Sequence, residues 1–246
     1  MPSVIQFRHQ GRKGVVALNP NLPPGKVAFR PSHKKFSTDF DSNFCVAGVS
    51  QPYTFGNLNK QLVLLLSGLG IPDQVFRDIF RKFYDDLEEV NRDREVAVEM
   101  LQWKNKFELS RLAVGGGPLP DPVRREVAKI QTNLLESSSK RSGGGREKEK
   151  LNPMVRESRM LYGVCDQTGR LEQGQCQVRI TTEGKGVLSL SGQVLVYRSP
   201  SYLLGDVRVL QAVHIPELAH LKAHPSFEKS YVINAGFFPD FQKSQG

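Results

Sequence analysis

The sequence has few of the residues that build metal sites, disulfide frameworks or membrane spans. Its 246 residues include three cysteines without CxxC spacing and five scattered histidines without an HxxxH or HExxH pattern. No zinc site or disulfide framework is indicated, which fits a reducing intracellular compartment, nucleus or cytoplasm. The longest apolar run, Leu62–Leu66, is too short to cross a bilayer, and the N-terminus lacks the apolar region of a signal peptide. Membrane and secreted proteins are therefore not expected.

Acidic residues are absent from the first 38 positions, where seven cations precede the first acid, Asp39. These cations are Arg8, Arg12, Lys13, Lys26, Arg30, Lys34 and Lys35. The whole chain has a formal net charge of +9. A basic surface favours an anionic partner, of which nucleic acid is the commonest, although charge alone fits a basic protein without such a partner equally well.

The apolar pattern changes twice along the chain, which predicts an α+β fold. Residues 1–54 and 154–222 contain short β-type runs between turn residues, and residues 55–136 have helical spacing. Residues 137–153 begin with SSSKRSGGGREKEK, which has no apolar residue and predicts a flexible linker. Residues 223–246 form an atypical tail. Candidate strands are 4–8, 14–18, 26–30, 45–49, 160–164, 175–180, 187–190, 194–197 and 207–213.

Three helical segments are expected between residues 57 and 136. The first ends at Gly68 and Gly70, the second begins near Pro72 and continues its periodicity to Trp103, and the third begins at Asp121-Pro122. Mixed charges from 85 to 94 predict a solvated helix face. Its carboxylates are expected to be surface groups rather than metal ligands, and they are Asp85, Asp86, Glu88 and Glu89.

The stretch 193–213, QVLVYRSPSYLLGDVRVLQAV, predicts a strand, a charged loop and a second strand. Arg198 and Arg208 bracket the loop, and Asp206 lies inside it. We expect Asp206 to be a structural residue of this rim, paired with one of the arginines. The alternative is a metal site shared with Asp166, which begins a predicted Asx turn, Asp166-Gln167-Thr168-Gly169.

Two short basic segments could bind phosphate. Gly11-Arg12-Lys13-Gly14 combines close backbone approach with a mobile ammonium group, but it lacks Walker A spacing, and a plain hairpin turn explains it equally well. Phe29 and Phe36 flank a second cationic loop, FRPSHKKF. Aromatics among cations suit a nucleic-acid surface, whereas core packing in adjacent strands is the alternative for these two residues.

Five collinear segments resemble the eukaryotic RNA-dependent RNA polymerases of RNA silencing. VIQFRHQGRKGVV, FRPSHKKF and GNLNKQLVLLLSGLGI follow the family patterns QxRxxGxKG, RPSxxKF and LNxQxIxLLxxLG. RMLYGVCD, with the glycine and leucine after it, resembles RxLxGVxDxxGxL. VLVYRSPSYLLGDVRVLQAV resembles VxVxRNPxxxPGDIRxLxAV. Together they span about residues 3–220.

The resemblance implies parts of two double-psi β-barrels joined by a helical connector. It assigns Lys13 and Lys34 or Lys35, supported by Arg8 and Arg30, to RNA and nucleotide phosphates. Arg198 is a further candidate for such a contact. The implied substrates are a single-stranded RNA template and nucleoside triphosphates, and the implied product is double-stranded RNA for small-RNA silencing. Silencing-complex proteins are further expected partners.

The sequence departs from the family pattern at several positions. Ser199 replaces an asparagine, Leu204 a proline and Gln167 an acid. The family continues to a DxDGD loop whose aspartates hold Mg²⁺, and no DxDGD occurs in this sequence. We therefore expect a fragment that begins within a strand pattern, ends on a frameshifted or intron-derived tail, binds no Mg²⁺ and is inactive alone. A non-catalytic RNA-binding or scaffold protein is the alternative, and an unstable gene remnant is a third.

Overall fold

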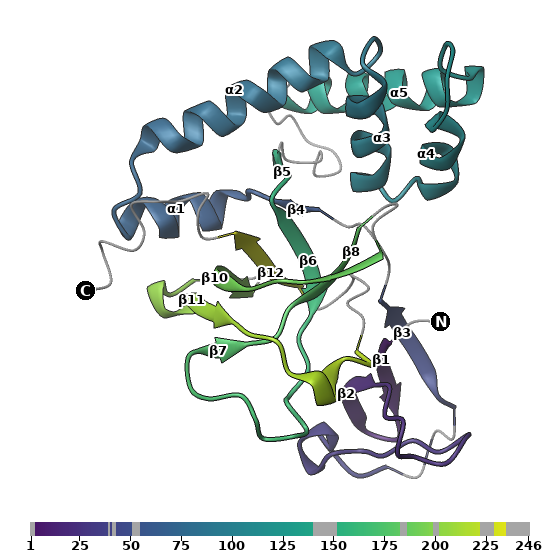
Figure 1. Ribbon diagram of the computed structural model, residues 1–246, viewed down its shortest axis with the longest axis vertical. Helices are drawn as coiled ribbons and strands as arrows, with labels where there is room; N and C mark the ends of the chain where they lie inside the picture. The colour runs from purple at the N-terminus through teal and green to yellow at the C-terminus, as the bar shows by residue number, and fades with distance from the viewer. Residues whose placement is uncertain are drawn as a thin grey trace. The chain divides into compact units, whose positions relative to one another are not determined.

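The computed structural model describes residues 3–38, 40, 43–50, 55–139, 152–182, 186–198, 202–221 and 229–234. It has a mixed α+β structure, as predicted (Figure 1). The chain divides into two compact units, and each is described by itself below. The β unit contains Met1–Thr54 and Glu157–Pro239, and the helical unit contains Phe55–Arg156.

In the described residues, the helical unit has five helices and one short pair of strands. Its elements are β4 (Gly56–Asn57), α1 (Lys60–Gly68), α2 (Asp73–Glu89), α3 (Arg94–Trp103), α4 (Phe107–Ala113), α5 (Asp121–Ser139) and β5 (Met154–Val155). Asn59 caps α1 by accepting the Leu62 N–H, and Pro72 is the residue before α2. β4 and β5 are antiparallel, with Gly56 opposite Val155, so the first and last segments of this unit are neighbours.

The sequence predicted fewer helices here than the structure contains. The expected second segment is divided into α2 and α3, because Asp93 accepts the N–H groups of Glu95 and Val96 and begins a new helix. α4 was not anticipated. The third expected helix is α5, which reaches Ser139 and so includes the first residues assigned to the linker.

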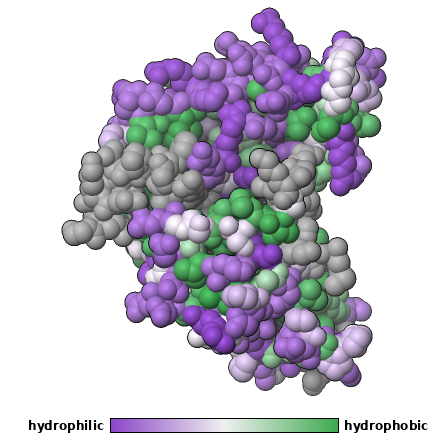
Figure 2. Space-filling model, viewed as in Figure 1, coloured by the Kyte–Doolittle hydropathy of each residue, from purple (hydrophilic) through white to green (hydrophobic). Residues whose placement is uncertain are grey.

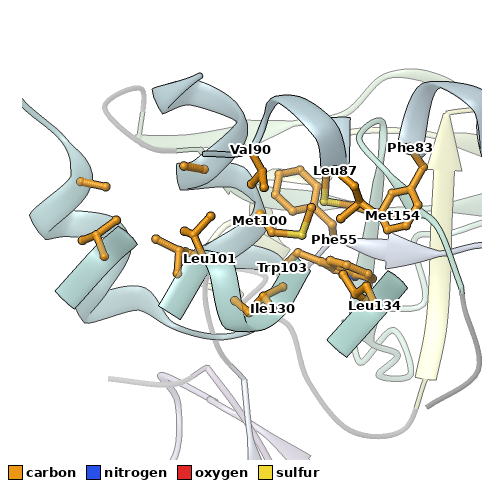
Figure 3. Close-up of a cluster of buried hydrophobic side chains, with 14 residues drawn as sticks. Phe55, Phe83, Leu87, Val90, Met100, Leu101, Trp103, Ile130, Leu134 and Met154 are labelled. Atoms are coloured by element: carbon orange, nitrogen blue, oxygen red, sulfur yellow. The ribbon is translucent and has the colours of Figure 1, made fainter. Parts of the chain in front are cut away.

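An apolar cluster forms a large part of the described core of the helical unit (Figure 3). Its 14 buried residues are Phe55, Phe83, Leu87, Val90, Ala97, Met100, Leu101, Trp103, Ala113, Val123, Val127, Ile130, Leu134 and Met154. The rings of Phe83 and Trp103 meet edge to face, with centroids 5.6 Å apart. Figure 2 shows a mainly hydrophilic surface over this unit, as expected for helices with one apolar side.

The expectation that Asp86 lies on a solvated face is wrong. Asp86 is 3% exposed, and its Oδ2 accepts a hydrogen bond from Arg156 Nη1 at 2.7 Å. Arg156 Nε also donates to Glu99 at 2.6 Å. Burial is the largest single influence on the pKa of Arg156 and lowers it. The hydrogen bonds and charges of Asp86 and Glu99 together outweigh burial, so the pKa is raised. This guanidinium joins β5 to α2 and α3, so the Asp86 carboxylate is structural.

The first sheet of the β unit has the strand order β2-β1-β3 and is antiparallel. Its strands are β1 (Val4–His9), β2 (Arg12–Ala17) and β3 (Cys45–Val49). A short 3-10 helix, η1 (Pro31–His33), lies in the segment between β2 and β3.

The second sheet has five strands in the order β6-β12-β10-β11-β7. These are β6 (Ser158–Tyr162), β7 (Gln175–Cys176), β10 (Gly192–Arg198), β11 (Val207–Ala212) and β12 (Lys229–Asn234). β10 is antiparallel to β11 and β12, and β11 is parallel to β7. A separate hairpin pairs β8 (Arg179–Thr182) with β9 (Gly186–Ser189), and two 3-10 helices complete the unit, η2 (Leu204–Asp206) and η3 (Pro216–Leu218).

Three expectations for the β unit need correction. Residues 26–30 form no strand, because a turn in which Lys26 N–H donates to Pro23 O precedes them and Pro31 opens a 3-10 helix directly after them. The single strand expected over 175–180 is two, β7 and β8. Lys229–Asn234, which lie in the tail predicted to be atypical, form strand β12 between β6 and β10. The predicted linker from 140 to 151 and most of the tail lie outside the described residues.

Within the described part of the chain, no helix is long and apolar enough to cross a membrane.

Candidate nucleic-acid interface

The β1–β2 turn fixes the backbone of the first basic segment. Gln10 and Gly11 have φ of 43° and 69°. Positive φ at both central positions is what a two-residue type I′ hairpin turn requires. A Cβ on Gly11 would lie 2.2 Å from the Phe36 carbonyl oxygen. Glycine at this position therefore allows the second basic segment to close against the turn.

The second basic segment is held against the first by backbone contacts. The N–H groups of Lys35 and Phe36 donate to Gly11 O at 2.9 and 3.3 Å. Lys34 forms an isolated antiparallel bridge with Arg12. Two segments separated in the sequence thus come together. We define the basic cluster as the cations gathered at this turn, namely Arg12, Lys13, Lys34 and Lys35 with Arg8 of β1, which lies opposite Lys13.

Arg8 and Lys13 are direct partners across the β1–β2 ladder, and both are exposed. Like charges directly opposite each other destabilise a strand pair. An anion bound beside both would remove this repulsion, and a phosphate oxygen can accept from both cations. The pair therefore suits a site that is stabilised when an anion is bound.

Arg30, a predicted phosphate-binding residue, has a different environment. Its Nη2 donates to Val15 O at 3.2 Å, and its Nε lies 3.2 Å from Nε2 of the buried His33. Burial is the main cause that lowers the pKa of His33, and the nearby charges of Arg30 and Lys35 lower it further. The imidazole is therefore neutral and can accept a hydrogen bond. The Arg30 backbone N–H also faces His33 Nδ1 at 3.3 Å, so both ring nitrogens lie beside donors of Arg30. Arg30 therefore organises the loop.

Aromatic rings fill the other side of this hairpin. Phe7 is fully buried, with ring centroids 5.1 Å from Phe29 and 5.4 Å from Phe44. The Arg12 guanidinium lies 5.4 Å from the Phe29 centroid. Phe36 is 63% exposed. The core alternative for Phe29 and Phe36 as residues of adjacent strands is therefore wrong: neither lies in a strand, and Phe36 is accessible.

Arg12 was not among the phosphate-binding residues predicted from the sequence. Its position within Gly11-Arg12-Lys13-Gly14 was the available signal, but only the fold shows its backbone pairing with Lys34 and its side chain over Phe29.

The β10–β11 hairpin contains the predicted rim. Oδ2 of Asp206 accepts the N–H groups of Tyr202 and Leu203, each at 3.0 Å. These bonds lower the pKa of Asp206, so the carboxylate stays ionised at neutral pH. Arg208 Nε donates to Gly205 O at 3.3 Å. The Asp206 carboxylate thus bonds to the backbone of its own turn, and the β10–β11 register ends at the adjacent pair, Tyr197 opposite Val207.

Asp166 forms the predicted Asx turn. Its Oδ1 accepts from the N–H and the hydroxyl of Thr168 at 2.7 and 2.6 Å, and Oδ2 accepts the Leu171 N–H at 2.9 Å. These bonds lower the pKa of Asp166 to about 2. The bond from the Leu171 N–H has the largest effect, followed by the bond from the Thr168 hydroxyl. The described residues contain no group of three or more histidines, cysteines or carboxylates that could hold a metal.

The comparison with known families agrees with the order of these segments. The sequence model of the family described as RNA dependent RNA polymerase matches residues 1–224. The chain belongs to this family. It is 32% identical over 244 residues to the probable RNA-dependent RNA polymerase SHL2 of Oryza sativa subsp. japonica, a match that covers 89% of this chain and 19% of that protein.

Other members of the polymerase family show the same partial coverage. RNA-dependent RNA polymerase 6 of Arabidopsis thaliana is 32% identical over 243 residues, again 89% of this chain and 19% of the relative. The solved structure of RNA dependent RNA polymerase QDE-1 from Thielavia terrestris aligns with a TM-score of 0.63 and 20% identity, over 98% of this chain and 32% of that one. The chain thus spans about a fifth of these plant relatives, and the structural match shows the shared fold.

Proposed function

We propose that this chain is part of an RNA-directed RNA polymerase core and that the basic cluster contacts the phosphates of single-stranded RNA or of nucleoside triphosphates. The observation that carries this proposal is the pairing of the exposed Arg8 and Lys13, with Lys34 brought beside Arg12. Family membership supports the polymerase assignment. Arg30 supports the cluster from behind, and Arg198 is a candidate for a separate phosphate contact.

The proposed architecture is a pair of double-psi β-barrels, to which the two sheets of the β unit contribute strands, with the helical unit as their connector. The proposed product is double-stranded RNA for small-RNA silencing. Silencing-complex proteins are proposed partners. The relatives named as RNA-dependent RNA polymerases support these proposals.

Mg²⁺ is the metal expected for such an enzyme, and two bound ions would activate a primer hydroxyl and stabilise the leaving pyrophosphate. The described residues of this chain do not fit that role. Both carboxylate oxygens of Asp166 accept backbone N–H groups of its own turn. One carboxylate oxygen of Asp206 does the same in its turn. No catalytic step is therefore assigned to residues of this chain.

RNA binding is tested by filter binding of a single-stranded 12-mer over a range of salt concentrations. Lys13→Ala with Lys34→Ala should weaken binding and reduce the slope of log K against log salt by roughly 1 to 2, because each phosphate contact releases counterions. Lys60→Ala with Lys129→Ala removes the same charge from exposed positions of the helical unit and should leave affinity and slope near those of the wild type. Equal effects of both double variants would refute the proposed site.

Catalysis is tested separately by Mg²⁺-dependent incorporation of labelled nucleotides on single-stranded RNA. We expect the 246-residue chain to bind RNA and not to extend it. Robust incorporation would contradict the view that it lacks the metal-binding carboxylates. Binding without incorporation is also what the scaffold alternative predicts, and a chain extended to include a DxDGD sequence separates the two.

A further inference from the structure

The outer edge of β11 is only partly covered. β7 pairs with β11 at Gln211 and Ala212, and there it stops. Because β7 is parallel to β11, the residues before Gln175 would lie beside Val207–Leu210 if β7 were longer. These residues instead form a turn, in which Gly174 has φ of 85° and Gln175 N–H donates to Glu172 O. Among the residues that the structure describes, none pairs with the β11 edge at 207–210 (Figure 1).

The backbone groups on this edge can be identified from the ladder. Gln211 N–H donates toward β7, to Gly174 O at 2.9 Å. Backbone groups alternate sides along a strand, so the N–H and C=O of Val209 and the C=O of Val207 point to the same side. The Val207 N–H is already bonded to Leu204 O. One donor and two acceptors therefore remain in a row, the arrangement to which an added strand binds.

An ordered apolar tip adjoins this edge. Tyr202, Leu203 and Leu204 are 72%, 70% and 50% exposed. Asp206 holds the first two in place through their N–H groups. Three consecutive exposed apolar side chains on a backbone held by hydrogen bonds are a typical feature of a binding surface, since little backbone ordering is needed on association.

The charges around the tip indicate the kind of partner. Arg198 and Arg208 are exposed, and the Asp206 carboxylate accepts bonds within its own turn. The two arginines outnumber the ionised Asp206 carboxylate, so the formal charge of this hairpin end is +1, which favours an acidic partner. A second copy of the chain is disfavoured, because antiparallel pairing of two β11 edges would bring like charges together and each chain carries +9. RNA suits the arginines and Tyr202, but it offers no row of amides to the edge groups of Val207 and Val209.

We propose that the β11 edge and the Tyr202–Leu204 tip form a docking site for an extended acidic peptide with alternating apolar residues. The peptide adds to the sheet as a strand beside Val207–Leu210, its apolar side chains contact the tip and its carboxylates lie near Arg208. This proposal does not rest on the polymerase function, because it is tested without RNA or nucleotide and either one can fail alone.

The test measures binding of a fluorescein-labelled nine-residue peptide of alternating glutamate and valine to the 246-residue chain by fluorescence anisotropy. Val209→Pro removes the outward donor without breaking a bond to β10, and Arg208→Glu reverses the charge. Each should weaken binding about ten-fold or more. Arg77→Glu, at an exposed position of α2, makes the same charge change and should alter affinity less than about two-fold.

A pair of N-methylated peptides tests the strand geometry on the wild-type chain, so the result does not depend on the folding of the proline variant. Only one edge of the peptide can face β11. N-methylation of alternate amides should therefore abolish binding for one set of positions and spare the other. Equal binding of both peptides, unchanged binding to Val209→Pro, or equal binding of a lysine–valine peptide would overturn the proposal. Binding of an RNA 12-mer that depends on Arg208 but not on Val209, with no peptide binding, would assign the tip to nucleic acid instead.

Discussion

The two units of this chain are stabilised in different ways. Among the described residues, one apolar cluster of the helical unit contains 14 buried residues, whereas a cluster of the β unit contains five, namely Leu161, Val178, Ile180, Val194 and Ala212. The β unit depends more on side chains bonded to backbone groups. Asp166 and Asp206 organise turns in this way, and Gln177 bonds to both Ile215 and Leu218.

This difference separates stability from function within one chain. All of the proposed phosphate contacts lie in the β unit, on strand ends and loops that bonds to the backbone hold in shape. The buried charges of the helical unit are paired with one another and serve the fold. Substitutions in the helical core should therefore change the free energy of unfolding, and those in the β loops should change local geometry and ligand binding.

The largest effect is expected from Phe83→Ala. It removes a fully buried ring that packs on Trp103 and should lower the free energy of unfolding by about 3–5 kcal/mol. Trp103 is the single tryptophan of the sequence, so its fluorescence during urea unfolding reports on the helical unit alone. Leu64→Ala, at a position of α1 that is 63% exposed, is the control and should have little effect. A loss of less than about 1 kcal/mol for Phe83→Ala would mean that the cluster is not the main stabilising feature.

The next effect concerns the buried charge group. Arg156→Met leaves the Asp86 carboxylate buried near one exposed lysine, Lys82, and should cost about 3 kcal/mol in the free energy of unfolding. Arg111→Met removes an exposed pair with Glu108 and should cost less than about 1 kcal/mol. Similar losses for both variants, measured by urea unfolding, would show that burial does not distinguish the two ion pairs.

A smaller effect is expected in the β unit from Gly11→Ala. The positive φ costs about 1–2 kcal/mol in any residue with a Cβ, and the approach of Phe36 O adds to it. Gly25→Ala has a similar φ of 75° but nothing within 4 Å, so it isolates the conformational cost. We expect Gly11→Ala to release the Lys34–Phe36 segment, seen as faster amide exchange at Lys35. Equal exchange in the two variants would contradict the proposed closure of the loop.

The smallest effect is a pH dependence at His33. The folded pKa lies below the ordinary value of about 6.5, so the unfolded chain binds the proton first as the pH falls. The stabilising contribution of the neutral imidazole is therefore complete above about pH 6.5 and is lost below it. Lys35→Met removes one cause of the shift and should raise the pKa of His33, as measured by NMR titration. If the pKa of His33 is unchanged in this variant, Lys35 does not contribute to lowering it.

Local features of the fold could be predicted from the sequence. β3 was expected at its observed bounds, and the end of α1, the start of α2 and the Asx turn at Asp166 follow from short-range residue chemistry. Features that depend on distant residues were missed. The burial of Asp86 requires Arg156, 70 residues away, and the two-residue β4–β5 pair has no periodicity to detect.

The candidate site shows the same limit. The basic segments were identifiable from charge and from the family resemblance, but their residues looked equivalent. The fold distinguishes them, because Arg30 bonds to His33 and Val15, while Arg8 and Lys13 remain exposed opposite each other. Arg12 joins the site through its bridge to Lys34, 22 positions away, and through its guanidinium over Phe29.

The short β4–β5 pair has an evolutionary consequence. Because Gly56 lies opposite Val155, the chain enters and leaves the helical unit at neighbouring points. A segment with adjacent ends can lengthen, shrink or be exchanged between related genes while the remaining chain needs only a short connection in its place. The helical unit can therefore change in length or sequence while the strands that carry the basic cluster keep their connection.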